Sequence, residues 1–169
     1  MNTRRGTTLI ETLLYLGILS AVLLAVSAFL GLAWTVRTKA RTMTDVDQAG
    51  TAAMRAITQA VRNATSVRAP AAGTSGNSLE LEGAAPGGGA TVFDVADGVL
   101  RVSEGGGEPV PLTDGNQTVL SFLVSEVSGT QSLPTVHIEF EVYRDVHVGR
   151  NEYQYARPFS GTAVLRTRL

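Results

Sequence analysis

The sequence predicts an α+β protein in which a long amino-terminal helix packs on an antiparallel β domain. Three observations lead to this fold class. Residues 12–36 carry no charge, residues 37–64 carry apolar residues at helical spacing, and short alternating segments follow after residue 68. Helical patterns that precede strand patterns are typical of α+β domains rather than of parallel sheets.

The first part of the helix is predicted to be apolar on every side. The segment Thr12–Val36 is about 25 residues long, which is enough to cross a hydrocarbon core. The helix need not end there, because the first proline is Pro70 and only Gly50 weakens the helix propensity before it. We expect one helix, roughly 90 Å long, with a transmembrane part (residues 7–36) and an amphipathic continuation (residues 37–67).

The amphipathic continuation is predicted from apolar residues that recur at steps of three and four. They are Ala40, Met43, Val46, Ala53, Ile57, Ala60, Val61 and Ala64. Asp45 and Asp47 are expected on the opposite, solvent-facing side. The apolar stripe needs a packing partner, and the predicted β domain, residues 68–169, supplies it.

Loops rich in glycine, proline and serine separate the alternating segments of the β domain. The expected strands are Leu79–Glu82, Thr91–Val95, Val99–Ser103, Val119–Val127, Thr135–Tyr143 and Thr162–Leu169. Asp97-Gly98 is expected to form the tight turn of a hairpin between the second and third of them. In the fifth, every second residue is apolar, which indicates one buried and one solvated face.

Charge is segregated along the chain, although the net charge is only -1. Residues 37–68 are mainly basic, residues 69–143 are acidic except for Arg101, and residues 144–169 are again basic. This layout predicts complementary faces, either within one molecule, with the basic helix on the acidic sheet, or between neighbouring subunits. The acidic sheet disfavours a nucleic-acid partner, which stays open only for the basic tail.

The motif that predicts a function lies at the start of the chain. Arg4 and Arg5 precede Gly6, which is followed by Thr7-Thr8-Leu9-Ile10-Glu11 and the uncharged segment. This pattern resembles the type IV pilin and pseudopilin family. The resemblance implies that residues 1–6 are a cytoplasmic leader, that a prepilin peptidase cuts between Gly6 and Thr7, and that the new amino terminus is methylated. Thr7 departs from the phenylalanine or methionine that is usual there.

Glu11 would be the fifth residue of the mature chain, where the family keeps a glutamate. A charged residue at the centre of a membrane helix costs about 2.5–3.5 kcal/mol on an insertion scale, so it is a functional candidate by default. The resemblance implies that Glu11 of an incoming subunit pairs with the terminal amine of the subunit already in the filament. Such charges about 4 Å apart attract by about 4 kcal/mol at an effective dielectric of 20, before desolvation.

Within the family, the rest of the chain is most similar to J-class minor pseudopilins and related minor pilins. The similarity lies in Met54–Ala64, at the expected helix end, and in "GVLRV", "EPVPLTDG" and "GTAVLRTRL". It implies a minor subunit, at or near the tip, of a type IV pilus, a type II secretion pseudopilus or a DNA-uptake pilus. The partners would be the prepilin peptidase, an inner-membrane assembly platform and other pilin-like subunits. The precursor would cross the cytoplasmic membrane once, with its amino terminus inside.

Two other interpretations of the apolar segment remain open. Glu11 could lie in the headgroup region of a permanent anchor that holds an extracytoplasmic β-rich binding domain. Alternatively, a signal peptidase could cut after Ala28, because Val26-Ser27-Ala28 has small residues at suitable positions. The released domain would then begin at Phe29.

No catalytic residue, cofactor or metal site is predicted, and we expect the chain not to be an enzyme. It has no cysteine, and no serine stands in a nucleophile-elbow context. His137, Glu139 and Glu141 share one face of an expected strand, but alternating polar residues are typical of any half-solvated strand. Asp114-Gly115-Asn116 lacks the later ligands of a calcium loop, so a plain turn is expected. Turns are also expected at the glycine clusters, residues 87–89 and 105–107, which lack the lysine and serine of a phosphate-binding loop.

Overall fold

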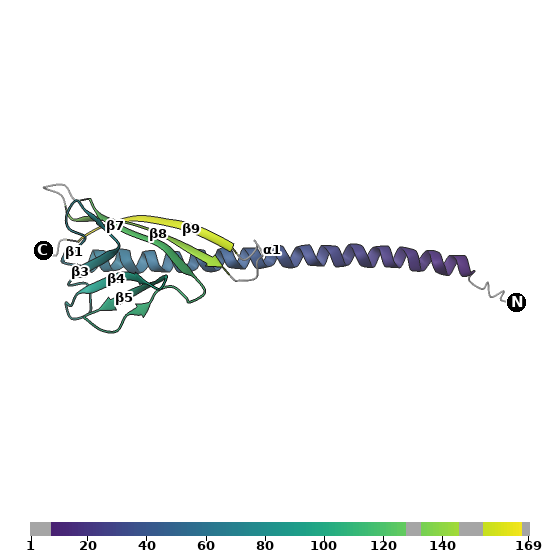
Figure 1. Cartoon of the computed structure of the whole chain (residues 1–169), viewed down its shortest axis with the longest axis horizontal. Helices are drawn as coiled ribbons and strands as arrows, with labels where there is room; N and C mark the ends of the chain where they lie inside the picture. Colours follow the sequence, from purple (N-terminus) through teal and green to yellow (C-terminus); the bar gives the residue numbers. More distant parts are fainter. Residues whose placement is uncertain (1–7, 128–132, 146–153, 167–169) are drawn as a thin grey trace. The chain divides into compact units, whose positions relative to one another are not determined.

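The computed structural model describes residues 8–127, 133–145 and 154–166 (Figure 1). These residues form one helix, α1 (Leu9–Asn63), and nine strands. The strands are β1 (Ser66–Ala69), β2 (Ser75–Gly76), β3 (Ser78–Glu82), β4 (Thr91–Ala96), β5 (Val99–Glu104), β6 (Val110–Pro111), β7 (Thr118–Glu126), β8 (Thr135–Asp145) and β9 (Gln154–Val164). A long helix packed on antiparallel sheets confirms the predicted α+β class.

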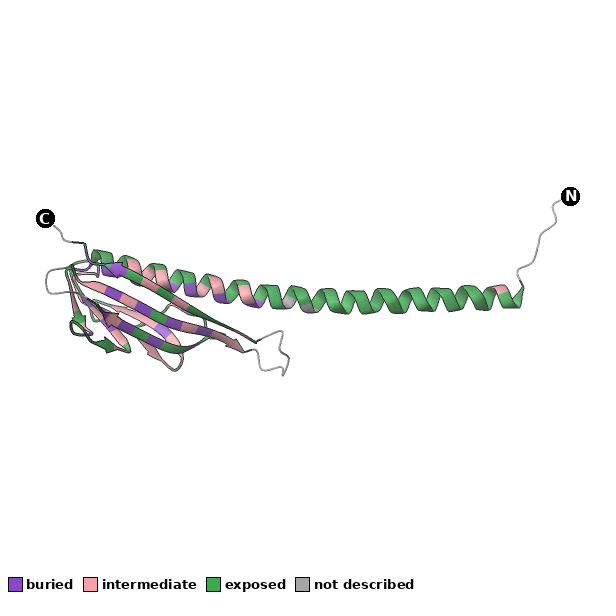
Figure 2. Cartoon of the chain, turned by 90° about the horizontal axis from the view of Figure 1, so that it is seen from above, coloured by how far each residue is buried: buried purple, intermediate pink, exposed green. Residues whose placement is uncertain are grey.

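The chain divides into two compact units, Met1–Ala40 and Arg41–Leu169. The helix α1 contributes its apolar part to the first unit and its amphipathic part to the second. In the first unit the described side chains of α1 are exposed all round, apart from the half-buried Glu11 (Figure 2).

In the second unit, α1 buries one stripe at steps of three and four residues. The stripe consists of Thr42, Val46, Gly50, Ala53, Ile57 and Val61, and Ala64 continues it just after the helix. The predicted stripe is therefore confirmed in its centre. Ala40 is exposed, however, and Met43 and Ala60 are only half-buried.

The helix ends at Asn63, four residues before the expected end. The predicted carboxyl-terminal boundary of the amphipathic continuation, residue 67, was therefore wrong. The backbone N–H of Thr65 donates to the carbonyl of Glu82 at 2.8 Å, and the Thr65 hydroxyl donates to the same oxygen at 2.9 Å. These bonds begin the pairing of β1 with β3, which competes with further helical bonds. The β domain thus begins at Ser66.

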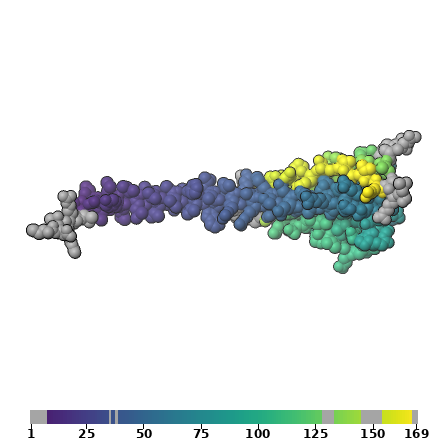
Figure 3. Space-filling view, turned by 180° about the vertical axis from the view of Figure 1, so that it is seen from behind, coloured from purple at the N-terminus to yellow at the C-terminus, as the bar shows by residue number. Residues whose placement is uncertain are grey.

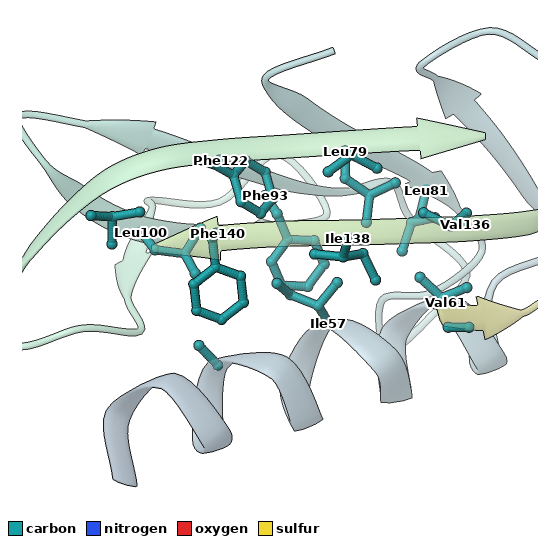
Figure 4. Packing of buried hydrophobic residues seen from close by; sticks show 14 of the residues in the cluster. Ile57, Val61, Leu79, Leu81, Phe93, Leu100, Phe122, Val136, Ile138 and Phe140 are labelled. Atoms are coloured by element: carbon teal, nitrogen blue, oxygen red, sulfur yellow. The ribbon is translucent and has the colours of Figure 1, made fainter. Parts of the chain in front are cut away.

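The strands form two antiparallel sheets. One has the order β1-β3-β4-β5-β6, and the other has the order β2-β7-β8-β9. Both sheets and α1 supply the core, in which Ile57 and Val61 point from the helix toward the strands (Figure 4). Phe140 lies at the centre, with its ring stacked on Phe159 at 5.3 Å and tilted against Phe122 at 6.5 Å.

The predicted hairpin turn at Asp97-Gly98 is confirmed. Ala96 pairs with Val99, and the two turn residues have φ angles of 52° and 73°. Positive φ at both central positions defines the tight turn whose twist matches the flanking strands, and aspartate followed by glycine suits it.

The last strand and three short strands were not predicted correctly. β9 covers Gln154–Val164, whereas the expected strand began at Thr162 and continued to the chain end. Pro158 and Gly161 hid the alternating pattern in β9, although proline is compatible with an edge strand. The strands β1, β2 and β6 are short pieces at sheet edges, too brief to show a period of two.

Gly50 of α1 lies against the Phe159 ring of β9. A Cβ atom at this position would lie 2.1 Å from two ring carbons of Phe159, so only glycine leaves room for the ring. Farther along the same crossing, a Cβ atom on Gly161 would lie 2.9 Å from the sulfur of Met54. The two glycines therefore set the distance between the helix and the edge strand.

Gly50→Ala should destabilise the second unit, although alanine favours a helix interior by about 1 kcal/mol over glycine. The added methyl group would meet the Phe159 ring, and overpacking of this kind costs about 1–3 kcal/mol. Urea unfolding of the full chain in detergent, followed by circular dichroism, measures the change. Gly31→Ala is the matched control, because nothing lies within 4 Å of its new methyl group. Equal unfolding midpoints for the two variants would contradict the packing argument.

Candidate functional site

The first candidate site is the uncovered apolar surface of α1. Its large apolar side chains are exposed throughout the first unit; they include Leu9, Ile10, Leu13, Leu14, Leu16, Ile18, Leu19, Val22, Leu23, Leu24, Phe29, Leu30, Leu32, Trp34 and Val36. In the most apolar 18-residue stretch of this helix, no residue is buried by other parts of the described chain. Among the described residues, α1 is the one helix long and apolar enough to cross a membrane.

Glu11 is the acidic residue in the first turn of this helix. Its carboxylate accepts a hydrogen bond from the hydroxyl of Tyr15, one turn later, at 3.3 Å. A negative charge in the first turn also interacts favourably with the helix dipole. The predicted cleavage site, Gly6 and Thr7, with Thr7 also the predicted methylation site, and the leader arginines, Arg4 and Arg5, lie outside the described residues.

Two ion pairs hold β8 and β9 to α1. Arg144 at the end of β8 binds Asp45, and Arg157 of β9 binds Asp47 at 2.5 Å. The guanidinium of Arg157 also lies over the Phe159 ring, 5.5 Å from its centroid. The two aspartates are therefore occupied by the sheet rather than left free on a solvent-facing side. The charges of these two pairs are also the reverse of a basic helix packed on an acidic sheet.

The hydrogen bond to Asp47 raises the pKa of Arg157, and the one to Asp94 raises the pKa of Arg101. For a base, a raised pKa stabilises the fold below the unfolded pKa, and this contribution is lost only when the pH rises through the folded pKa. Both values lie far above neutrality. These arginines therefore give no pH dependence of stability in the physiological range.

Two of the polar strand residues considered for metal binding, His137 and Glu139, contact each other. The two ring nitrogens of His137 lie 3.0 Å from the hydroxyl of Thr162 and 3.1 Å from the carboxylate of Glu139. The described part of the chain contains no group of three or more histidine, aspartate or glutamate residues placed to hold a metal. Asp114 begins a turn, since the N–H of Gln117 donates to its carbonyl at 2.9 Å.

A polar pocket of about 450 Å³ lies beside the Asp45–Arg144 pair. Gln117, which is only 5% exposed, lines it and donates its side-chain N–H to the carbonyl of Asp45 at 3.3 Å. The other lining residues are Gln48, Ala49, Ala52, Leu112, Asp114 and Asn116. The sequence does not reveal this pocket, because its walls come from segments far apart in the chain and share no motif.

A second hollow, which we call the basic groove, lies at the carboxyl end of α1. Its volume is about 390 Å³, and its walls are Gln59, Arg62, Asn63, Val164, Leu165 and Arg166. An adjoining hollow shares Gln59 and Arg62 and adds Arg55. Figure 3 shows the end of β9 beside this part of the helix. The groove joins the basic helix segment to the basic tail that the sequence singled out.

No known protein family, curated protein or solved structure matches this chain.

Removing Arg144 should cost more stability than removing Arg157. The Arg144 side chain is 19% exposed and that of Arg157 is 46% exposed, so solvent screens the second pair more strongly. We expect Arg144→Gln to lower the free energy of unfolding by about 1 kcal/mol, because the half-exposed Asp45 loses a charged partner. Arg157→Gln should have a smaller effect that fades at about 1 M salt, where the Debye length is about 3 Å. Urea titrations at low and high salt measure both variants, and a larger loss for Arg157→Gln would refute this order.

Proposed function

We propose that this chain is a minor pilin or pseudopilin subunit that assembles through α1 into a membrane-derived filament. The observation that carries the proposal is the lone carboxylate of Glu11 in the first turn of an uncovered apolar helix. The sequence around it, from Arg4 to Glu11, supports the same function through its resemblance to that family. The β domain would be the extracytoplasmic part and would make contacts between subunits rather than catalyse a reaction.

The chemistry of assembly follows from the proposed cleavage after Gly6. Cutting this peptide bond creates an amine on Thr7, which is methylated but remains a cation. A membrane interior disfavours both an isolated carboxylate and an isolated ammonium. When subunits associate, Glu11 of the incoming subunit exchanges the neutral hydroxyl of Tyr15 for the cationic amine of its neighbour. The pair then compensates both charges and fixes the axial register of adjacent helices.

The partners follow from this sequence of events. A prepilin peptidase removes residues 1–6, an inner-membrane assembly platform lifts the subunit, and other pilin-like subunits receive α1. The machine is a type IV pilus, a type II secretion pseudopilus or a DNA-uptake pilus. A permanently anchored binding protein is the second candidate, and the polar pocket beside Arg144 supports it.

The mass of the mature amino terminus separates these functions. We expect the protein recovered from cells to begin at methylated Thr7, and Gly6→Val to keep residues 1–6 because the bulky side chain blocks cleavage. Mass spectrometry of the amino-terminal peptide gives the answer directly. A wild-type chain with an intact Met1 would indicate a permanent anchor, and a chain that begins at Phe29 would indicate a released domain. Either result would refute the proposed processing.

Glu11→Ala should leave membrane insertion and cleavage intact while it reduces incorporation into filaments at least tenfold. The alanine variant keeps the apolar helix but cannot compensate the amine of the neighbouring subunit. Immunoblots of sheared filaments and of membranes measure the two pools separately. Thr12→Ala, at the next residue, is the matched control and should assemble normally. Wild-type incorporation of the Glu11→Ala chain would contradict the proposed pairing.

A further inference from the structure

We infer that the basic groove at the end of α1 binds the acidic turn between β5 and β6 of a second copy of this chain. The turn is the segment Glu104–Glu108, which we call the acidic tip. The inference goes beyond the proposed function, which gives the β domain contacts between subunits but names neither the residues that make them nor their partner. It concerns a lateral contact between β domains and identifies its occupant by charge and by position in the fold.

The groove carries positive charge that no acidic group among the described residues neutralises. Arg62 and Arg166 line it, and Arg55 stands two turns before Arg62 on the same side of α1. All three side chains are exposed, and no ion pair within the described residues includes them. The acids of the amphipathic helix segment, Asp45 and Asp47, are already bound by β8 and β9.

The acidic tip has the complementary character. Glu104 and Glu108 are exposed and take part in no ion pair within the described part of the chain. Three glycines separate them, so the turn projects two carboxylates without other side chains. The turn is well defined, because the N–H of Gly107 donates to the carbonyl of Glu104 at 2.9 Å and the Ser103 hydroxyl donates to that of Gly107 at 2.7 Å.

Apolar residues flank both surfaces and can be covered by the same contact. Val164 is 44% exposed in the wall of the groove, and Val110 is 58% exposed next to the acidic tip. A core of apolar contact surrounded by charged groups is the usual composition of a specific interface. The opposite charges would steer the association and select its orientation.

Both surfaces lie at the same end of the second unit, which makes a lateral contact possible. Thr65, just after α1, donates to the carbonyl of Glu82 on β3. Leu81 pairs with Thr91 across to β4, and Thr91 pairs with Glu104 across to β5. Copies whose helices run parallel can therefore bring the groove and the tip together by a sideways displacement. Because the two surfaces differ, the contact between two copies leaves one groove and one acidic tip free.

Cross-linking between two full-length copies tests this contact. Because the chain has no native cysteine, the reagent reacts only with the introduced cysteines. One tagged copy carries Asn63→Cys in the groove, and the other carries Pro109→Cys beside the acidic tip. The two precursors are purified, mixed in detergent and treated with a short bismaleimide reagent. We expect a cross-linked product that joins the two tags and weakens at high salt. Absence of this product would overturn the inference.

Charge reversal decides whether the proposed residues make the contact. Arg62→Glu in the groove copy should reduce the product at least tenfold. Glu104→Arg together with Glu108→Arg in the other copy should then restore at least half of it. Arg41→Glu, which makes the same change outside the groove, should leave it unaltered. A product that survives Arg62→Glu, falls equally with Arg41→Glu or is not rescued by the exchanged charges would overturn the inference.

This experiment is independent of the proposed processing, since it uses the uncut precursor with Glu11 and Gly6 intact. Failure of cleavage or of the Glu11 pairing would leave the cross-linking result unchanged. Conversely, loss of the cross-link would leave the proposed assembly through α1 standing. The two ideas can therefore fail separately.

Discussion

The structure depends on one constraint: a single unbroken helix has to suit two different surroundings. Up to Val36 its described side chains are exposed, apart from the half-buried Glu11, whereas from Thr42 one face is buried. The two sheets rely on that face, because Ile57 and Val61 complete a core that the strands alone would leave open. Burial of each large apolar side chain contributes about 1.5–3 kcal/mol, so the helix stripe is a major part of the stability of the β domain.

The joint between α1 and β9 combines close packing with charge. Gly50 leaves space for the Phe159 ring, which stacks on Phe140, and Arg157 covers the same ring while it binds Asp47. Sterics, aromatic stacking and an ion pair therefore act at one crossing. In a filament subunit held by its helix, this joint would carry force from α1 into the sheet. An edge strand fixed in this way is also less available for unwanted strand pairing.

Charge segregation has different consequences in different parts of the molecule. Within the second unit, helix aspartates bind sheet arginines, and Arg68 bridges Glu80 and Glu82 across β1 and β3. At the end of α1, by contrast, arginines line a hollow without acidic partners among the described residues. Pairing within the molecule thus accounts for the helix aspartates and leaves a basic surface and an acidic turn for contacts between molecules.

The sequence by itself determined the α+β class, the uncharged helix, the centre of the amphipathic stripe and the Asp97-Gly98 turn. These features follow from local periodicity and from backbone conformations that few residues adopt. It also singled out Glu11, because a charge inside an apolar run is conspicuous without any fold. Only the tertiary structure decided that there are two sheets, that α1 ends at Asn63, that Gly50 receives Phe159, and where the groove lies. Each of these depends on contacts between residues distant in the chain, for which local sequence carries no periodic signal.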